Sequence, residues 1–301
     1  MQCSVLVNTA NRPEFLERCL AAFYRQSCMD FEMVVADDGS DEQTLRVVTS
    51  HEREAPFPIR HIWHPPLGHR RVEILNKGIA ACRTEYVIFT DCDSLAPSWF
   101  VEGHLRRRRP ERMLIGGRIK LNRAQTDSLT VEAVRSGAFE SLAAPAHLRA
   151  LSWRHWQNVF EILARRKGRP HNLGLNMSME MRALETVNGY DNEFRGWGNA
   201  DGDLRERLRM AGIRPLSIWR EVYIFHQWHP QAPRGEGNPE YARRPHIPMR
   251  ASNGLAQARE AHKTREHATY LAFRESWLNP GHKSAPPSQD APSPSRGATW
   301  G

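Results

Sequence analysis

The chain has 301 residues, of which 40% are hydrophobic and 25% are charged, and its formal net charge is +8 at pH 7. This composition is ordinary for a globular protein with a core, and the length suits one large domain or two small ones. The apolar runs are too short to span a bilayer, so we expect a soluble or at most peripheral protein. The positive charge suits an anionic partner, namely a nucleic acid, a nucleotide diphosphate or an acidic membrane face.

Cysteine usage indicates a reducing compartment. The five cysteines lie in the first third of the chain, their number is odd, and none forms a CxxC pair. This pattern argues against both a disulfide framework and a zinc module. A strand-like run begins almost at once, at Cys3, with no basic segment and long apolar stretch before it. We therefore expect no signal peptide and a cytoplasmic protein.

Strand-like and helix-like segments alternate through the first part of the chain. Strands are predicted at 4–7, 31–36, 59–63 and 86–90, and helices at 13–26, 41–54 and 70–81. This alternation predicts an α/β fold, with a mostly parallel sheet flanked by helices on both faces. In such sheets ligands bind beyond the carboxyl ends of the strands. The acidic clusters Asp37-Asp38-Gly39-Ser40 and Asp91-Cys92-Asp93 both follow strands, and we expect the functional site there.

The remaining segments are less regular. We expect helices with basic turns over 121–169, a helix over 200–210, a strand over 222–225 and one helix from 255 to about 277. Residues 280–301 are rich in Pro and Ser and are predicted to be disordered. The predicted organisation is one catalytic domain over 1–230, with halves 1–120 and 121–230, then a partly helical extension over 231–278 and a disordered tail over 279–301.

Asp91-Cys92-Asp93 is a candidate metal site. Two carboxylates one residue apart on a turn can share a hard divalent cation, which would bridge and neutralise a diphosphate. The alternative is a solvated turn that caps a helix beginning near Pro97. A bare DxD is a weak signal, and its place at a strand's carboxyl end strengthens it.

The turn at Asp38 is a candidate nucleoside site. Asp38 could accept a hydrogen bond from the imide N–H of a uracil ring, and Gly39 would permit the tight turn. The alternative is a turn whose Ser40 or Asp41 caps the next helix.

Three linked segments, 5–13, 31–40 and 86–93, resemble the nucleotide-binding half of family 2 glycosyltransferases in order and spacing. The resemblance implies a GT-A fold, a nucleoside-diphosphate sugar donor, and Mn²⁺ or Mg²⁺ held by Asp91 and Asp93. It implies the following donor-side residues: Asn8, Thr9, Asp38, Arg70, Asn76, Asp91, Cys92 and Asp93.

Within that set, Gly68-His69-Arg70 with Asn76 resembles a Gly-Phe-Arg…Arg-Asn stretch near the diphosphate and sugar. His69 and Leu75 depart from that pattern. A guanidinium at Arg70 could fork onto phosphate oxygens, and the alternative is a surface arginine.

Segments 174–178, 188–194 and 196–204 resemble the acceptor side of the galactosyltransferase-like branch, seen in β-1,4-galactosyltransferases and chondroitin-polymerase-type enzymes. The resemblance implies that Trp197, with Asn176 and Gly198, shapes the sugar and acceptor site, and that Asp201 is the general base of an inverting transfer. The alternative, compatible reading is that Asp201 and Asp203 favour the dipole of the helix over 200–210.

The segment 225–230 supplies two further histidines. In the related branch a histidine after this strand completes the metal site, and imidazole binds Mn²⁺ beside carboxylates. His226 is the favoured third ligand beside Asp91 and Asp93, and His229 is the alternative.

An arginine run at 106–109 has two interpretations. It is the solvated end of a helix, or it docks to an anionic membrane face that carries a lipid-linked acceptor.

The leading hypothesis is an inverting transferase that moves a hexose or N-acetylhexosamine from a UDP-sugar to a glycan or glycolipid. One rival is a non-catalytic nucleotide-sugar- or carbohydrate-binding protein of the same fold, because Ala200 stands where the family usually has Glu. A nucleotidyltransferase would want a Gly-rich basic loop, which residues 8–13 lack. No helix-turn-helix, zinc finger or RNP-like motif supports nucleic-acid binding.

Overall fold

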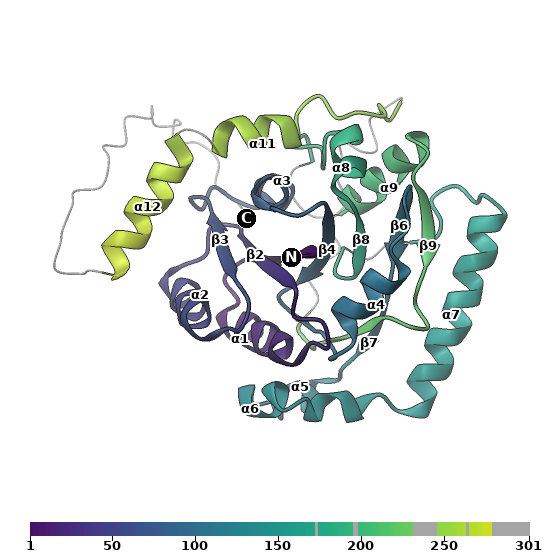
Figure 1. The fold of residues 1–301 in the computed structure, drawn as a ribbon, viewed down its shortest axis with the longest axis horizontal. Helices are drawn as coiled ribbons and strands as arrows, with labels where there is room; N and C mark the ends of the chain where they lie inside the picture. The colour runs from purple at the N-terminus through teal and green to yellow at the C-terminus, as the bar shows by residue number, and fades with distance from the viewer. Residues whose placement is uncertain (172–173, 195–197, 231–245, 263–264, 279–301) are drawn as a thin grey trace, which may run out of the picture.

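The computed structural model describes residues 1–171, 174–194, 198–230, 246–262 and 265–278 (Figure 1). A seven-stranded sheet of order β3-β2-β1-β4-β8-β6-β9 forms the centre, and a second sheet has the order β5-β10-β7. The strands are β1 (Cys3–Thr9), β2 (Phe31–Asp37), β3 (Ile59–Trp63), β4 (Tyr86–Asp91), β5 (Ser94–Leu95), β6 (Arg112–Ile115), β7 (Gly117–Lys120), β8 (Met177–Glu180), β9 (Arg214–Ser217) and β10 (Tyr223–His226).

Helices cover both faces of the large sheet, with α3, α8, α9 and α11 on one side and α1, α2 and α4 on the other (Figure 1). The helices are α1 (Pro13–Ala22), α2 (Glu42–Glu54), α3 (Arg71–Ala81), α4 (Phe100–Arg107), α5 (Arg123–Asp127), α6 (Val131–Arg135), α7 (Pro145–Leu163), α8 (Met181–Val187), α9 (Ala200–Met210), α11 (Leu255–His262) and α12 (Arg265–Leu278), with 3₁₀ turns at Phe23–Arg25 and Ala138–Leu142. Because side chains alternate along a strand, β1 sends Leu6 to the α3 face and Val5 and Val7 to the α1 face.

The predicted α/β class and mostly parallel sheet are confirmed. β3, β2, β1 and β4 are mutually parallel, whereas β8 runs antiparallel between β4 and β6. The four-residue strands β6, β7, β8 and β9 have no counterpart in the sequence-based expectation. They are too short to show a clear apolar run, and their place depends on neighbours distant in sequence.

The local expectations had mixed outcomes. Asp41 caps α2 by accepting a hydrogen bond from the Gln43 amide at 3.1 Å, and Gly39 has a φ of +73°. The alternative that the Asp91 turn caps the next helix is wrong, because that turn leads into β5 and the N-cap position of α4 is Trp99.

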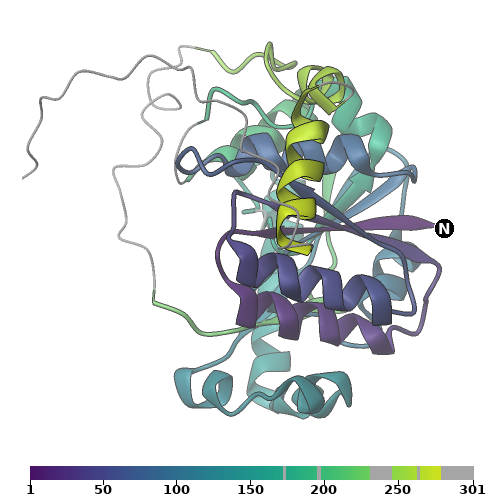
Figure 2. The ribbon, with the colours of Figure 1, turned by 90° about the vertical axis from the view of Figure 1, so that its left-hand side faces the viewer.

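The single helix expected from 255 is also wrong, because α11 and α12 are separate helices that run in different directions (Figure 1). Leu255 of α11 joins the core on the α3 face. α12 lies across the β3 edge (Figure 2), where Phe273 stacks on Trp63 with ring centroids 4.1 Å apart and Arg274 pairs with Glu52.

None of the helices in the described ranges combines the length and the hydrophobicity that crossing a membrane requires.

Candidate functional site

The carboxyl ends of β1, β2 and β4 meet at one edge of the sheet. In the strand register Asn8 is opposite Asp91, and Thr9 is opposite Asp37. The Asn8 Oδ1 atom is buried and accepts no hydrogen bond from the described residues. The structure therefore brings the ends of three predicted strands, and both acidic clusters, to one edge.

Arg71 joins the first half of the chain to the second. Its Nη2 lies 3.5 Å from Asp91 Oδ1, and its Nη1 lies 3.6 Å from Asp201 Oδ1. The Tyr190 hydroxyl donates a hydrogen bond to the same Asp201 oxygen at 2.9 Å. One guanidinium thus lies between the DxD motif and the predicted base, although the two carboxylates are far apart in sequence.

The electrostatics of this cluster are strongly coupled. Burial raises the pKa of Asp91 to about 6, with Arg71 opposing the shift and the carboxylates of Asp93 and Asp201 adding to it. Burial alone would lower the pKa of Arg71, but the two carboxylates raise it well above its usual value. Arg71 is therefore a fixed positive charge between the two carboxylates.

A second cluster holds the groups best suited to a metal. One ligand atom each from Asp93, His226 and His229 lies within 4.8 Å of the others. The Nε2 atoms of His226 and His229 lie 3.6 Å and 3.2 Å from Asp93 oxygens. β10 ends at His226, where it pairs with β5, and the Gln227 amide donates to the Asp93 carbonyl at 2.8 Å, so the two ligand segments are held together.

This donor set fits a divalent cation. Asp93 Oδ1 is buried and accepts no hydrogen bond from the described residues, which leaves an oxygen free to ligate. One carboxylate and two imidazoles suit Mn²⁺. Both His226 and His229 belong to the group, whereas the sequence favoured His226 with His229 as an alternative, and Asp91 stands outside it.

The protonation tendencies of this group differ from residue to residue. Burial would raise the pKa of Asp93, but a hydrogen bond from His229 and the two imidazoles hold it below its usual value. Burial lowers the pKa of His226, and the hydrogen bond to Asp93 raises that of His229. His226 is therefore the more readily neutral imidazole, the form that binds a metal.

Arginines surround this cluster. Arg12 Nη1 lies 3.7 Å from Asp93 Oδ2, and burial lowers the pKa of Arg118, which interacts with Asp93 and Asp91. A hollow of about 490 Å³ opens beside His229, and its charged lining is mixed, with Arg12 and Arg18 opposite in sign to Glu14 and Asp127. The arginines next to Asp93 are the groups here that suit an anionic ligand.

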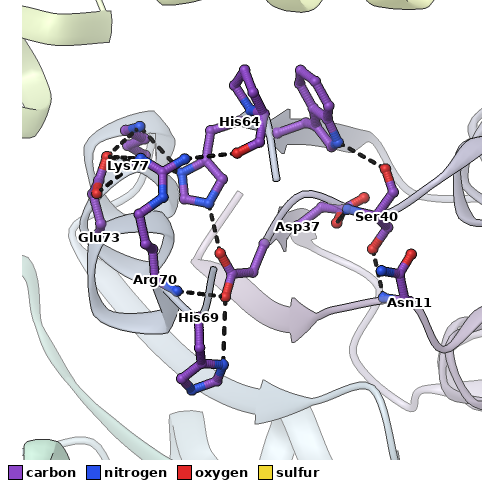
Figure 3. Close-up of polar contacts among 11 residues, drawn as sticks. Asn11, Asp37, Ser40, His64, His69, Arg70, Glu73 and Lys77 are labelled. Atoms are coloured by element: carbon purple, nitrogen blue, oxygen red, sulfur yellow. Dashed lines mark hydrogen bonds and ion pairs between the residues drawn. The ribbon is translucent and has the colours of Figure 1, made fainter. Parts of the chain in front are cut away.

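Residues of the β3–α3 connection, among them His64 and Arg70 (Figure 3), hold Asp38 in a polar network. His64 Nε2 lies 2.7 Å from Asp38 Oδ1, and the Arg70 amide donates to Asp38 Oδ2 at 2.9 Å. Lys77 Nζ lies 3.3 Å from His64 Nδ1 and 2.8 Å from Glu73 Oε1. Because an ammonium only donates, Nδ1 accepts and Nε2–H donates to Asp38, which defines the His64 tautomer. Asp38 is 3% exposed at its side chain, so nucleoside contact by it stays a prediction.

Two predicted asparagines are fully buried and bonded within the protein, so direct ligand contact by them stays a prediction. Asn176 is fully buried, donates to the Gly117 carbonyl at 2.8 Å and contacts His104. Asn76 is fully buried and exchanges hydrogen bonds with the backbone of Tyr190 at 2.8 Å. Asn76 acts on the site indirectly, because it positions the residue that bonds to Asp201.

Arg70 was assigned to the diphosphate, but its guanidinium contacts Glu73 and the Pro65 carbonyl. The neighbouring Arg71 is the arginine of the cleft. Burial raises the pKa of the Cys92 thiol to about 12 and Cys92 is 5% exposed, so its contact with the nucleotide sugar stays a prediction.

The acceptor-side motif is partly described. Trp197 lies outside the described residues, and Gly198 adopts a φ of +101°. A Cβ on Gly174 would stand 2.8 Å from both Arg71 Nη2 and Asp201 Oδ2, so this glycine lets the backbone approach the charged pair. Asp203 differs from Asp201, because it is fully buried and pairs with Arg207 at 2.7 Å.

The residues that sequence reasoning missed are Arg71, Tyr190 and His64. Tyr190 lies within the segment 188–194, and Arg71 directly follows Gly68-His69-Arg70. Their places in or next to these motifs could have identified them as site residues. His64 follows β3 at the same sheet edge as the acidic clusters, and that edge position was its only signal.

Comparisons with known proteins agree with this geometry. Residues 4–135 match the model for glycosyl transferase family 2, and residues 154–227 match the model described as the N-terminal domain of galactosyltransferase. The predicted resemblance, to both families and in the same order, is confirmed.

Three known proteins illustrate the likeness. A validoxylamine A glucosyltransferase from Streptomyces hygroscopicus subsp. jinggangensis is 28% identical over 73% of this chain and 54% of its own length. A chondroitin synthase from Pasteurella multocida is 26% identical over 69% of this chain and 23% of its own. The structure of a Pyrobaculum calidifontis mannosyltransferase in complex with GDP-Man and Mn²⁺ covers 93% of this chain and 74% of its own, with a TM-score of 0.54 and 18% identity, which shows a shared fold. The chain thus spans about half or less of the length of these two curated relatives.

Proposed function

We propose that this chain, which belongs to glycosyl transferase family 2 and has the GT-A fold, transfers a hexose or N-acetylhexosamine from a UDP-sugar to a hydroxyl group of a glycan or glycolipid. The observation that carries the proposal is the position of Arg71 between Asp91 and Asp201, beside the Asp93, His226 and His229 cluster. The names of the two relatives, a glucosyltransferase and a chondroitin synthase, support hexose-type donors.

The cofactor of the proposal is Mn²⁺ or Mg²⁺, held by Asp93, His226 and His229 with Asp91 beside them. When bound, it would neutralise the charge of the diphosphate leaving group. Asn8 and Thr9, at the end of β1, and Asp38, at the end of β2, are proposed to contact the nucleoside.

Asp201 is the proposed general base. It takes the proton of the acceptor hydroxyl while that oxygen forms a bond to the anomeric carbon and the bond to the diphosphate breaks, which inverts the configuration. Tyr190 and Arg71 orient Asp201 from two sides at 2.9 and 3.6 Å. Arg71 also balances the negative charge of the two carboxylates and the incoming donor.

The second candidate is a non-catalytic sugar- or nucleotide-binding protein, favoured by Ala200. The arrangement of Asp201, Tyr190 and Arg71 argues for catalysis, because pure binding of a donor does not require an oriented carboxylate facing the DxD motif. We also propose a cytoplasmic location, which is consistent with five free cysteines, three of them fully or nearly buried.

The test is nucleotide release from a panel of UDP- and GDP-sugars, with Mn²⁺ or with a chelator. We expect release of UDP that needs the metal, and a loss of about hundredfold or more in Asp201→Asn, which keeps size and loses basicity. A thermal-shift titration of the donor checks that Asp201→Asn still binds it. Donor binding without turnover in the unaltered protein would support the non-catalytic candidate, and unchanged turnover in Asp201→Asn would remove the base assignment.

A further inference from the structure

Helix α7 presents an aromatic stripe to solvent. Trp153, Trp156, Phe160 and Leu163 follow one another at spacings of three, four and three, which places them on one face of the helix. Their exposed fractions are 76%, 58%, 65% and 77%. The residues of α7 that are buried include the polar Asn158 and Glu161. Leu151 of the same helix is buried, but these four large apolar side chains face outward, the reverse of a surface helix that packs its apolar face on a core.

The surroundings of the stripe are strongly basic. Residues 145–171 contain six basic side chains, Arg149, Arg154, Arg165, Arg166, Lys167 and Arg169. The acidic residue in this range is Glu161, which is 1% exposed and faces Arg166 at 3.8 Å. Arg149 precedes Trp153 by four residues and so lies on the same face.

An apolar groove continues the surface. It has a volume of about 480 Å³ and lies between the end of α7 and β9, the edge strand of the large sheet. Its apolar lining includes Ile162, Leu163 and Leu216, and Arg109 and Arg112 lie along it. Arg109 is the last residue of the arginine run at 106–109.

The other three arginines of the run form ion pairs within the protein. Arg106 and Arg107 pair with Glu221, and Arg108 forks onto Glu180 at 2.8 and 2.9 Å. The run by itself is therefore not a free cationic face, and the α7 surface is the better candidate for contact with an anionic partner.

We propose that this surface, defined by Trp153, Trp156, Phe160 and Leu163 with the basic residues around them, docks the protein on a bilayer of anionic lipids. Indole and phenyl rings partition into the membrane interface, and flanking Arg and Lys side chains bind acidic headgroups. The stripe lies in the interfacial plane, and the groove beside β9 takes apolar parts of the lipid.

A second copy of the chain is a poorer occupant. In a two-fold dimer each stripe meets itself, so two basic surfaces would face one another, and Glu161, the carboxylate of residues 145–171, is buried. An anionic bilayer supplies both the apolar layer and the missing negative charge.

The experiment is flotation of the full chain with vesicles of phosphatidylcholine that contain phosphatidylglycerol, and with vesicles of phosphatidylcholine alone. We expect binding to the anionic vesicles that weakens at high salt, and little binding to the neutral ones. Trp153→Asp should reduce binding at least about tenfold. It removes an apolar side chain that the membrane would bury, and it adds a negative charge that the anionic lipids repel. Arg165→Glu should reduce it by at least about fivefold.

The matched control is Leu271→Asp on α12, an exposed leucine on the opposite side of the molecule from α7 (Figure 1). It should bind vesicles like the unaltered protein, and melting temperatures check that every variant folds. No binding to the anionic vesicles, or equal binding by Trp153→Asp, would overturn the proposal. So would a dimer in sedimentation velocity that Trp153→Asp converts to a monomer. These readouts do not depend on turnover, so they stand apart from the proposed transferase activity.

Discussion

The guanidinium of Arg71 lies 3.6 Å from the carboxylate of Asp201, the predicted base. Arg71 is the first residue of α3, which follows β3, and Asp201 is in the first turn of α9. Because the same guanidinium also contacts Asp91, it links the DxD motif to Asp201. The contact therefore joins residues of the two segments that match family models, 4–135 and 154–227, in one cluster.

Replacing Arg71 should damage catalysis more than replacing its neighbour. Arg71→Ala removes the charge that opposes the raised pKa of Asp91, so that pKa should rise further above 6 and the acid limb of the rate profile should move to higher pH. We expect a loss of about hundredfold in kcat. Arg70→Ala is the matched control, because its side chain contacts Glu73 and Pro65, and we expect a much smaller loss. Equal effects in steady-state kinetics would contradict this assignment.

Both histidines of the candidate metal cluster should matter. His226→Ala and His229→Ala should each weaken Mn²⁺ binding by about tenfold to hundredfold, since each removes a neutral nitrogen donor. Isothermal titration with Mn²⁺ measures the change. His69→Ala is the control, because its ring lies near Asp38 and not near Asp93. If His229→Ala binds Mn²⁺ with unchanged affinity, His229 is not a metal ligand and His226 is the histidine that binds the ion.

The His64–Asp38 contact should affect donor binding more than turnover. His64→Gln cannot reproduce the imidazole that links Lys77 to Asp38, so we expect KM for the donor to rise several-fold with kcat nearly unchanged. His61→Gln is a matched control, because His61 makes a similar buried contact with Asp37 at 2.9 Å. If both variants change KM equally, the contact has only a structural role.

Stability should fall on acidification because of His104. Burial lowers its folded-state pKa to about 3, whereas an unfolded histidine titrates near 6.5. Between these values the unfolded chain binds the extra proton, so the free energy of unfolding falls as pH falls, by about 1.4 kcal/mol per pH unit from this residue. Denaturant unfolding at pH 7 and at pH 5 measures the slope.

His104→Gln supplies the control for that slope, since it keeps an amide for Ser178 and Asn176 and does not titrate. Its free energy of unfolding should depend less on pH than that of the unaltered protein. An identical dependence would place the acid sensitivity elsewhere in the chain.

Much of the donor half was predictable because its signals are local. Strands β1, β2 and β4 are mostly apolar, and each has turn residues or carboxylates at its carboxyl end. In the second half, helix α9 begins and ends where expected, at Ala200 and Met210. By contrast, the short strands β6 to β9 depend on pairing partners far away in sequence, and no local pattern marks them.

The sequence by itself determined the parallel half of the sheet, the family resemblance and the two carboxylate clusters, because strand periodicity and motif order are properties of the chain. Only the tertiary structure decided that Arg71 rather than Arg70 enters the cleft, that His229 joins His226 beside Asp93, and that Asn76 and Asn176 are buried. Arg70 is the non-helical N-cap of α3 and Arg71 is its first helical residue, so their side chains leave the backbone in different directions and meet different partners. The outward stripe of α7 was decided in the same way, because a helical pattern gives an apolar face and only packing shows whether that face is covered.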